Sequence, residues 1–191
     1  MLRIKMNSPL LIIVSGLPAT GKTTISKELV KEFSLPLIGK DIIKESLFNS
    51  LGVKDRAWSK ELGKASYPIL YSFIKAQLNA NKSLLVESNF SNQFDTPILK
   101  DFISKYDARV LAIYCECDGS VLFERFKTRA LSGKRHPGHQ DHLNFDEFKD
   151  SLSKGKIEKL ELDCKSLTVN TTNIDDLDLT EVKVEIKSLL S

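Results

Sequence analysis

The sequence has few cysteines, little net charge and no long hydrophobic run. It contains 3 cysteines in 191 residues, and the closely spaced Cys115 and Cys117 favour reduced, buried thiols over a disulfide framework. The net charge of +3 is too small to indicate a surface for long nucleic acids, although a local basic patch could still form. No run approaches the ~20 apolar residues needed to cross a bilayer, so we expect no membrane span.

The remaining composition is ordinary for a globular protein, with 41% hydrophobic and 28% charged residues. We expect one domain over residues 1–191. Strand and helix patterns alternate, which predicts an α/β fold with a parallel sheet and helices on both faces. Strands are expected at 10–14, 35–38, 83–87, 110–115 and 167–170, and helices at 24–33, 41–51, 55–81, 95–106, 119–131 and from 180 onward.

Three positions mark expected helix irregularities or ends. Pro68 lacks a backbone donor and predicts a kink or break near Tyr67. Thr96 before Pro97 predicts a helix start, and Thr180 is expected to cap the last helix.

The strongest motif is GLPATGKT at residues 16–23, which matches G-x-x-x-x-G-K-[ST] directly after the apolar residues 10–14. Its glycines let the backbone turn so that N–H groups point at phosphate oxygens, and the following helix adds its positive end. The motif predicts a nucleoside triphosphate site. The residues expected to contact ATP here are Gly16, Leu17, Pro18, Ala19, Thr20, Gly21, Lys22, Thr23 and Thr24.

Two residues of the motif carry charge or bind metal. Lys22 should reach the β- and γ-phosphates and stabilise charge during transfer. The hydroxyl of Thr23 should bind a Mg²⁺ ion that bridges these phosphates. ATP and Mg²⁺ are therefore the expected cofactors.

The amino-terminal segment faintly imitates a secretory signal, since Arg3 and Lys5 precede the apolar residues 10–14. That run is short and leads straight into the phosphate-binding motif, so cleavage there would destroy the site. We expect the protein in the cytoplasm, where ATP is available.

Asp41 follows the second expected strand, at the sheet edge where ligands of open α/β sheets bind. A carboxylate there could accept the proton of a hydroxyl group that attacks the γ-phosphorus. Capping of the helix at 42–51 is the structural alternative.

The phosphate-binding motif followed by D-x-x-K at Asp41 and Lys44 resembles small P-loop kinases, among them polynucleotide 5′-kinase and chloramphenicol phosphotransferase. This resemblance implies a three-layer fold with strand order 2-3-1-4-5, and it implies that Asp41 is the general base. Polynucleotide kinases have an arginine for the acceptor phosphate at the position of Lys44. A lysine keeps the charge but loses the bidentate fork.

Glu87 and Asn89 end the third expected strand. Similar kinases carry an acidic residue there, so Glu87 could hold a metal-bound water and Asn89 could orient the acceptor. Capping of the turn is the structural alternative for Glu87.

A polar, glycine-containing stretch at residues 132–144 is expected to form a mobile lid. Arg125 and Arg129 precede it on one helix face, and Arg135 lies within it. In similar kinases such arginines neutralise charge on the transferring phosphate. Arg125 and Arg129 are thus candidate catalytic residues, and Arg129 and Arg135 are candidate ATP ligands. A solvated basic face is the alternative.

All three histidines lie in the string RHPGHQDH. His136 and His139 are expected to contact the acceptor, while a metal site and a plain surface loop remain the other interpretations. Similar kinases hold adenine near residues 170–172. Trp58, Tyr67 and Tyr71 could wall the acceptor pocket or belong to the core.

Three functions follow from these features. The first is transfer of the ATP γ-phosphate to a hydroxyl of a small molecule. The second is a polynucleotide 5′-kinase, which would show steep salt dependence of substrate binding. The third is an ATP-binding switch whose lid is recognised by a partner protein.

Overall fold

The structure is a computed structural model that describes residues 8–191. Residues 1–7, which include the signal-like Arg3 and Lys5, lie outside the described part. Within residues 8–191, no helix has both the length and the apolar character that a membrane span requires.

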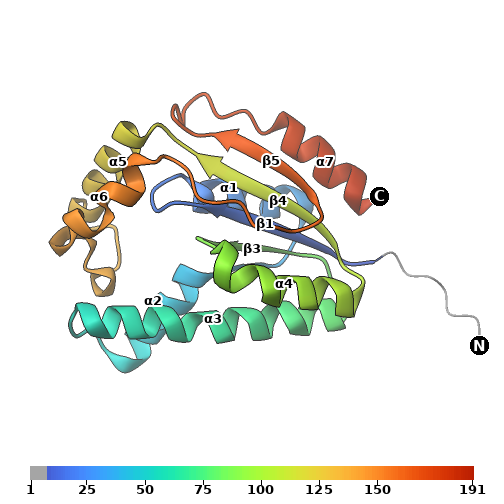
Figure 1. Cartoon of the computed structure of the whole chain (residues 1–191), viewed down its shortest axis with the longest axis horizontal. Coiled ribbons are helices and arrows are strands. Elements are labelled where there is room, and N and C mark those ends of the chain that lie inside the picture. Colours follow the sequence, from blue (N-terminus) through green and yellow to red (C-terminus); the bar gives the residue numbers. More distant parts are fainter. Residues whose placement is uncertain (1–7) are drawn as a thin grey trace, which may run out of the picture.

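Five parallel strands form one sheet in the order β2-β3-β1-β4-β5. This confirms the predicted α/β fold class and strand order. The strands are β1 (Leu10–Gly16), β2 (Leu37–Gly39), β3 (Leu84–Ser88), β4 (Arg109–Glu116) and β5 (Lys165–Asn170). The carboxyl ends of the labelled strands β1, β3, β4 and β5 point to the left in Figure 1, and β2 is parallel to them.

Helices surround this sheet on both faces (Figure 1). They are α1 (Lys22–Phe33), α2 (Lys40–Leu51), α3 (Arg56–Asn79), α4 (Asn92–Tyr106), α5 (Gly119–Leu131), α6 (Phe145–Ser153) and α7 (Thr180–Leu190). Two short 3-10 helices, η1 (Pro137–His139) and η2 (Asp141–Leu143), lie in the predicted lid between α5 and α6.

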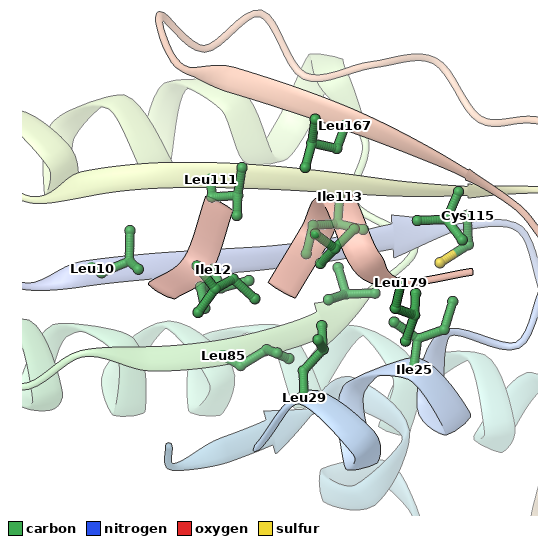
Figure 2. Packing of buried hydrophobic residues seen from close by; sticks show 14 residues of the cluster. Leu10, Ile12, Ile25, Leu29, Leu85, Leu111, Ile113, Cys115, Leu167 and Leu179 are labelled. Carbon is green, nitrogen blue, oxygen red and sulfur yellow. The ribbon is translucent and has the colours of Figure 1, made fainter. Parts of the chain in front are cut away.

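The central strand β1 is buried throughout and supplies side chains to both faces of the sheet. Leu10, Ile12 and Val14 pack with Ile25 and Leu29 of α1 and with residues of α7. Figure 2 shows this packing, with the α1 side chains directed at the strands. Every second residue of β1 faces this side of the sheet, because successive side chains of a strand point to opposite faces.

The opposite face of β1 presents Leu11 and Ile13, which pack against Leu70 and Ile74 of α3 and against Leu99 of α4. A smaller apolar cluster joins α5 to α6 beyond the strand ends. This third cluster holds the lid segment next to the sheet edge where β1 ends, because the lid connects these two helices.

The prediction near Tyr67 was a kink or a break; the helix α3 continues through Pro68, so the break is wrong. Pro68 lies on the exposed side of the helix, where water can bind the carbonyl that lacks its N–H partner. The buried residues Leu62, Leu70 and Ile74 hold the helix against the sheet on either side of it.

Two helix starts also differ from the predictions. The helix α4 begins at Asn92 with Ser91 as its cap, and Pro97 lies inside it. Thr180 is the first residue of α7 rather than its cap, and its N–H donates to Asp178 Oδ1.

The helix α6 was not predicted at all. Its signal is short, with Phe145, Phe148 and Leu152 at helical spacing next to a polar stretch. Phe145 and Phe148 pack on Phe126 of α5, so tertiary contact supports this helix.

We predict that Leu70→Ala lowers the free energy of unfolding by about 2–5 kcal/mol, because it opens a cavity between α3 and the sheet. Leu70 is fully buried, whereas its neighbour Ile69 is 44% exposed. The control Ile69→Ala should change stability by less than about 0.5 kcal/mol. Urea unfolding of both variants measures the difference, and equal losses would contradict the assigned packing face.

Candidate active site

A cavity of about 1160 Å³ opens at the carboxyl ends of the strands. Its wall includes the 16–23 motif, α2, α3, the end of β3, α5 and the predicted lid. It is the place where open α/β sheets bind ligands.

The phosphate-binding motif joins β1 to α1 in a turn that requires glycine at its start. A Cβ atom on Gly16 would lie 2.6 Å from the carbonyl oxygen of Cys115 and 2.8 Å from Thr20 Oγ1. Gly21, which precedes α1, has a φ of 84°, in the left-handed region that favours glycine. The turn brings the backbone of the motif to the positive end of α1.

Lys22 is buried at the centre of this turn. Its Nζ donates hydrogen bonds of 2.8 Å to the carbonyl oxygens of both Gly16 and Leu17. Burial lowers the pKa of Lys22, although the carboxylate of Glu87 acts against this effect. The cation thus lies beside the loop where phosphate oxygens are expected.

The two predicted metal ligands lie together. Thr23 Oγ1 donates a 2.8 Å hydrogen bond to Glu87 Oε1. The parallel register explains this contact, because Glu87 of β3 pairs with Val14 just before the motif. Burial raises the pKa of Glu87, and Lys22 and Thr23 act in the opposite direction.

This pair of oxygen ligands fits Mg²⁺, which keeps several waters and takes other ligands from phosphates. Within residues 8–191, no group of three or more His, Cys, Asp or Glu side chains is arranged to hold a metal by itself. Any ion here would therefore depend on the nucleotide for part of its coordination.

Arg129 contributes cationic donors that lack hydrogen-bond acceptors. Its Nε and Nη2 atoms are buried and make no hydrogen bond within the described residues, and Nη2 lies 3.6 Å from Asp141 Oδ2. A buried donor without a hydrogen bond destabilises the folded protein, and a ligand that accepts the hydrogen bond removes this cost. Because Arg129 lines the cavity, an anionic ligand would supply that partner.

Arg125 also lines the cavity, but its guanidinium is engaged by backbone. It donates to the carbonyl oxygens of Thr171 and Thr172, at 2.6 and 2.7 Å. Arg125 is thus joined to the loop after β5, which the sequence suggested for adenine, and its catalytic role stays a prediction.

The lid, residues 132–144, is docked on α2 through Arg135. Arg135 Nη2 lies 2.8 Å from Asp41 Oδ2, and Nη1 lies 3.5 Å from Glu45 Oε1. Its Nε lies 3.3 Å from Asp141 Oδ2 within the lid itself. One guanidinium therefore joins the candidate base to the lid.

Asp41 is held as a carboxylate by these cations. Burial alone would raise the pKa of Asp41, but the charges of Arg135 and Lys40 outweigh it and keep that pKa well below its usual range. Asp41 lies in the first turn of α2, whose cap position is Gly39. The side chain is paired with the lid, not used as a cap.

His139 is buried between the lid and α2, and its contacts define its proton position. Arg135 can only donate, so Nδ1 of His139, at 3.1 Å, accepts. Nε2 therefore carries the proton and donates to Glu45 Oε1 at 2.8 Å. Burial also lowers the pKa of His139, which favours this neutral form.

The other two histidines point elsewhere. His136 lies 3.2 Å from Asn49 Oδ1 and stacks on Phe48, while His142 is exposed. His136 and His139 both line the cavity, at its α2 side, as an acceptor contact requires.

Gly138 seats the lid directly on the Phe48 ring of α2. A Cβ atom at Gly138 would lie 2.5 Å from that ring. The lid thus lies directly against α2 here, and a side chain at position 138 would collide with the Phe48 ring.

The remaining predicted acceptor residues reach the same cavity. Lys44 is buried in its wall, and Asn89 is exposed to it at the end of β3. Tyr67 and Tyr71 line the cavity and also pack against the core, so both interpretations hold for them. Trp58 does not line the cavity, and its Nε1 donates a hydrogen bond to the carbonyl oxygen of Gly52.

Sequence reasoning missed the contacts that close the far wall. Arg56 of α3 donates to both carboxylate oxygens of Glu147 on α6, at 3.0 and 2.9 Å, and to the His139 carbonyl oxygen at 3.0 Å. Lys60 also pairs with Glu147. These contacts could have been predicted only together with α6, because that helix places Glu147 opposite α3.

Residues 11–154 match the model of a protein family described as the AAA domain. The chain belongs to this AAA domain family. A candidate kinase from Chloroflexus aurantiacus is 37% identical to it, over 97% of this chain and 100% of that one, with a TM-score of 0.89. The resemblance to P-loop kinases is therefore confirmed.

More distant structures share the fold of this AAA domain protein. A Mycobacterium tuberculosis APS kinase is 14% identical, with a TM-score of 0.55 and coverage of 97% and 99% of the two chains. Adenylate kinase 8 of Mus musculus is 33% identical over 73 residues, which are 38% of this chain. This chain matches only 15% of the length of that relative.

We predict that Gly138→Ala loosens the lid, because the new methyl group would collide with Phe48. Overpacking of this kind costs about 1–3 kcal/mol. Hydrogen exchange of the lid amides should become faster than in the wild type.

Phe48→Ala provides the control, since it removes the ring that the methyl group meets. Adding Gly138→Ala to Phe48→Ala should change lid exchange little. An unchanged exchange rate in Gly138→Ala alone would show that the lid is not seated on Phe48.

Proposed function

We propose that this protein is an ATP-dependent kinase that transfers the γ-phosphate of ATP to a hydroxyl group of a small-molecule acceptor. The observation that carries the proposal is the position of Asp41, which lines the same cavity as Lys22, Thr23 and Arg129. One cavity thus contains a phosphate-binding loop and a carboxylate that could serve as a base. Membership in a family with kinase structures supports the same reaction class.

The proposed donor half consists of residues 16–24 with Arg129 and Arg135. Backbone N–H groups of the loop and the Lys22 amine bind phosphate oxygens. The buried donors of Arg129 that make no hydrogen bond stabilise charge on the transferring group. Mg²⁺, held through Thr23 and Glu87, would neutralise phosphate charge when bound.

In the proposed acceptor half, the hydroxyl oxygen of the acceptor lies at Asp41 and attacks the γ-phosphorus. The bond from that phosphorus to the bridging oxygen of ADP breaks, and the hydroxyl proton passes to Asp41. Arg135 is paired with Asp41 Oδ2 and keeps the pKa of this carboxyl low, so movement of Arg135 away from Asp41 would make it a stronger base for the proton. Lys44, Asn89, His136 and His139 contact the rest of the acceptor.

The activity can be tested with γ-labelled ATP, fractionated metabolites and short oligonucleotides. A labelled small molecule supports the proposal, whereas labelled oligonucleotides would favour the polynucleotide 5′-kinase. Nucleotide-dependent capture of a partner without any labelled product would favour the switch.

We predict that Asp41→Asn lowers phosphotransfer to the acceptor by about 10²–10⁴-fold, because the amide cannot accept the proton. Affinity for ATP should stay within a few-fold of the wild type, since the phosphate-binding loop is unchanged. Steady-state kinetics and nucleotide titration measure the two effects.

Asp101→Asn serves as the matched control, because Asp101 is exposed on α4, away from the cavity. It should retain wild-type rates. Full phosphotransfer by Asp41→Asn would exclude Asp41 as the base.

A further inference from the structure

His136 of the lid is held in one protonation state by its contacts. The Gly138 N–H donates a 3.1 Å hydrogen bond to Nδ1 of His136, and Asn49 Oδ1 of α2 lies 3.2 Å from its Nε2. A backbone N–H can only donate, so Nδ1 must accept and Nε2 must carry the proton. The contacts of His139 require the same neutral form.

The two lid histidines therefore follow one pattern. Nδ1 of each ring accepts from a donor of the lid, and Nε2 of each ring donates to an oxygen of α2. The first bond holds the ring in place within the lid, and the second crosses to the helix. Docking of the lid on α2 thus uses both rings in their neutral form.

Protonation would remove the acceptor from each ring. A charged imidazole carries a proton on both nitrogens, so Nδ1 would face the donor from which it now accepts. At His139 this donor is the Arg135 guanidinium, so two cations would lie 3.1 Å apart around a side chain that is only 4% exposed. At His136 the donor is the Gly138 N–H, whose hydrogen bond would be lost.

The Phe48 ring of α2 contacts both histidines. Its centroid is 5.2 Å from that of His136 in a stacked arrangement, and 5.8 Å from that of His139 in an edge arrangement. An aromatic ring packs favourably with a neutral or with a cationic partner. The requirement for neutral rings therefore comes from Nδ1, not from Phe48.

The charges around His139 come from α2, α3 and the lid. The pKa of His139 lies below its ordinary value of 6.5, because burial outweighs the hydrogen bond to Glu45. Asp41 and Glu45 stay ionised between pH 7 and 5, since their pKa values lie below the ordinary ones, and Lys44 stays cationic, since its pKa is about 8. The charged or titratable groups that face His139 or its partner Arg135 are Asp41, Lys44, Glu45, Arg56, Arg135, His136 and Asp141.

We propose that the lid is an acid-sensitive latch, in which protonation of His139 and His136 releases residues 132–144 from α2. Because docking lowers the pKa of His139, the released lid binds protons more tightly than the docked lid. Docking is therefore strongest above pH 6.5, the ordinary pKa of histidine, and weakens as the pH falls below it. The lid is part of the cavity wall, so its release opens the site.

The latch goes beyond the proposed function, since it depends only on contacts between the lid and α2. It still affects the same site, because Arg135 belongs to the lid. Release of the lid would separate this guanidinium from Asp41.

Amide hydrogen exchange at pH 7 and pH 5 tests the latch. Gly138, His139 and Gln140 are the reporters, because their N–H groups donate hydrogen bonds within the lid. Their protection factors, which correct for the intrinsic effect of pH on exchange, should be at least about 10-fold lower at pH 5. Linkage predicts such a weakening when docking requires neutral histidines. Unchanged protection would refute the latch, and so would an equal loss in the amides of α1, which report global unfolding.

The double variant His136→Gln with His139→Gln removes the titration and retains the hydrogen bonds. A glutamine amide offers one acceptor and one donor, as each neutral ring does. Lid protection in this variant should therefore not change between pH 7 and 5. A loss as large as that of the wild type, in the folded variant, would contradict the proposal.

His142→Gln is the matched control, because His142 lies in the same lid but is exposed. It should keep the pH dependence of the wild type. If His142→Gln instead abolished that dependence, the assignment to His136 and His139 would be wrong.

Nitrogen NMR of the wild-type protein covers the case in which the double variant fails to fold. Ring nitrogen shifts distinguish the neutral Nε2–H form of a histidine from the charged form. Loss of lid protection that follows the titration of His139 or His136 supports the latch, whereas loss at a pH where neither ring titrates would exclude it.

These measurements separate the latch from the proposed kinase, because they use neither ATP nor an acceptor. Absence of phosphotransfer would leave the latch standing. Absence of the latch would leave the kinase standing.

Discussion

The pairing of β1 with β3 is the constraint on which the site depends. Their parallel register places Val14 beside Glu87, so the chain leaves β1 for the phosphate-binding loop where β3 presents its carboxylate. The contact between Thr23 and Glu87 follows directly. Apolar side chains on both faces of β1 fix this register, because a slip by one residue would exchange the two cores.

The placement of the proposed donor half was predictable because the residues that form it are close together in the sequence. Residues 16–23 contain both the turn and the side chains that it positions, and the apolar run before them indicated a buried strand. The five strands were found for the same reason, while their order came from the family resemblance. The place of Glu87 at a strand end was predictable because a strand end is recognisable from the apolar residues that precede it.

The acceptor half was less predictable because it forms between segments far apart in the chain. Nothing local to Arg135 indicates that it pairs with Asp41, and nothing local to Gly138 indicates the ring of Phe48. Ser59 and Arg56 lie on α3, and which side of α3 faces α2 and α6 depends on how this helix packs against the sheet. The short α6 was missed because its pattern is weak without Phe126 as a partner.

The ion pair between Arg135 and Asp41 has a consequence for the fate of ATP in the proposed kinase. A water molecule that enters the cavity before the acceptor meets a carboxylate whose pKa the guanidinium keeps low, so this carboxylate is a poor base for the proton of that water. Nucleotide bound alone would then be spared from wasteful hydrolysis. An acceptor that displaces Arg135 would free the base at the moment when a productive hydroxyl is present.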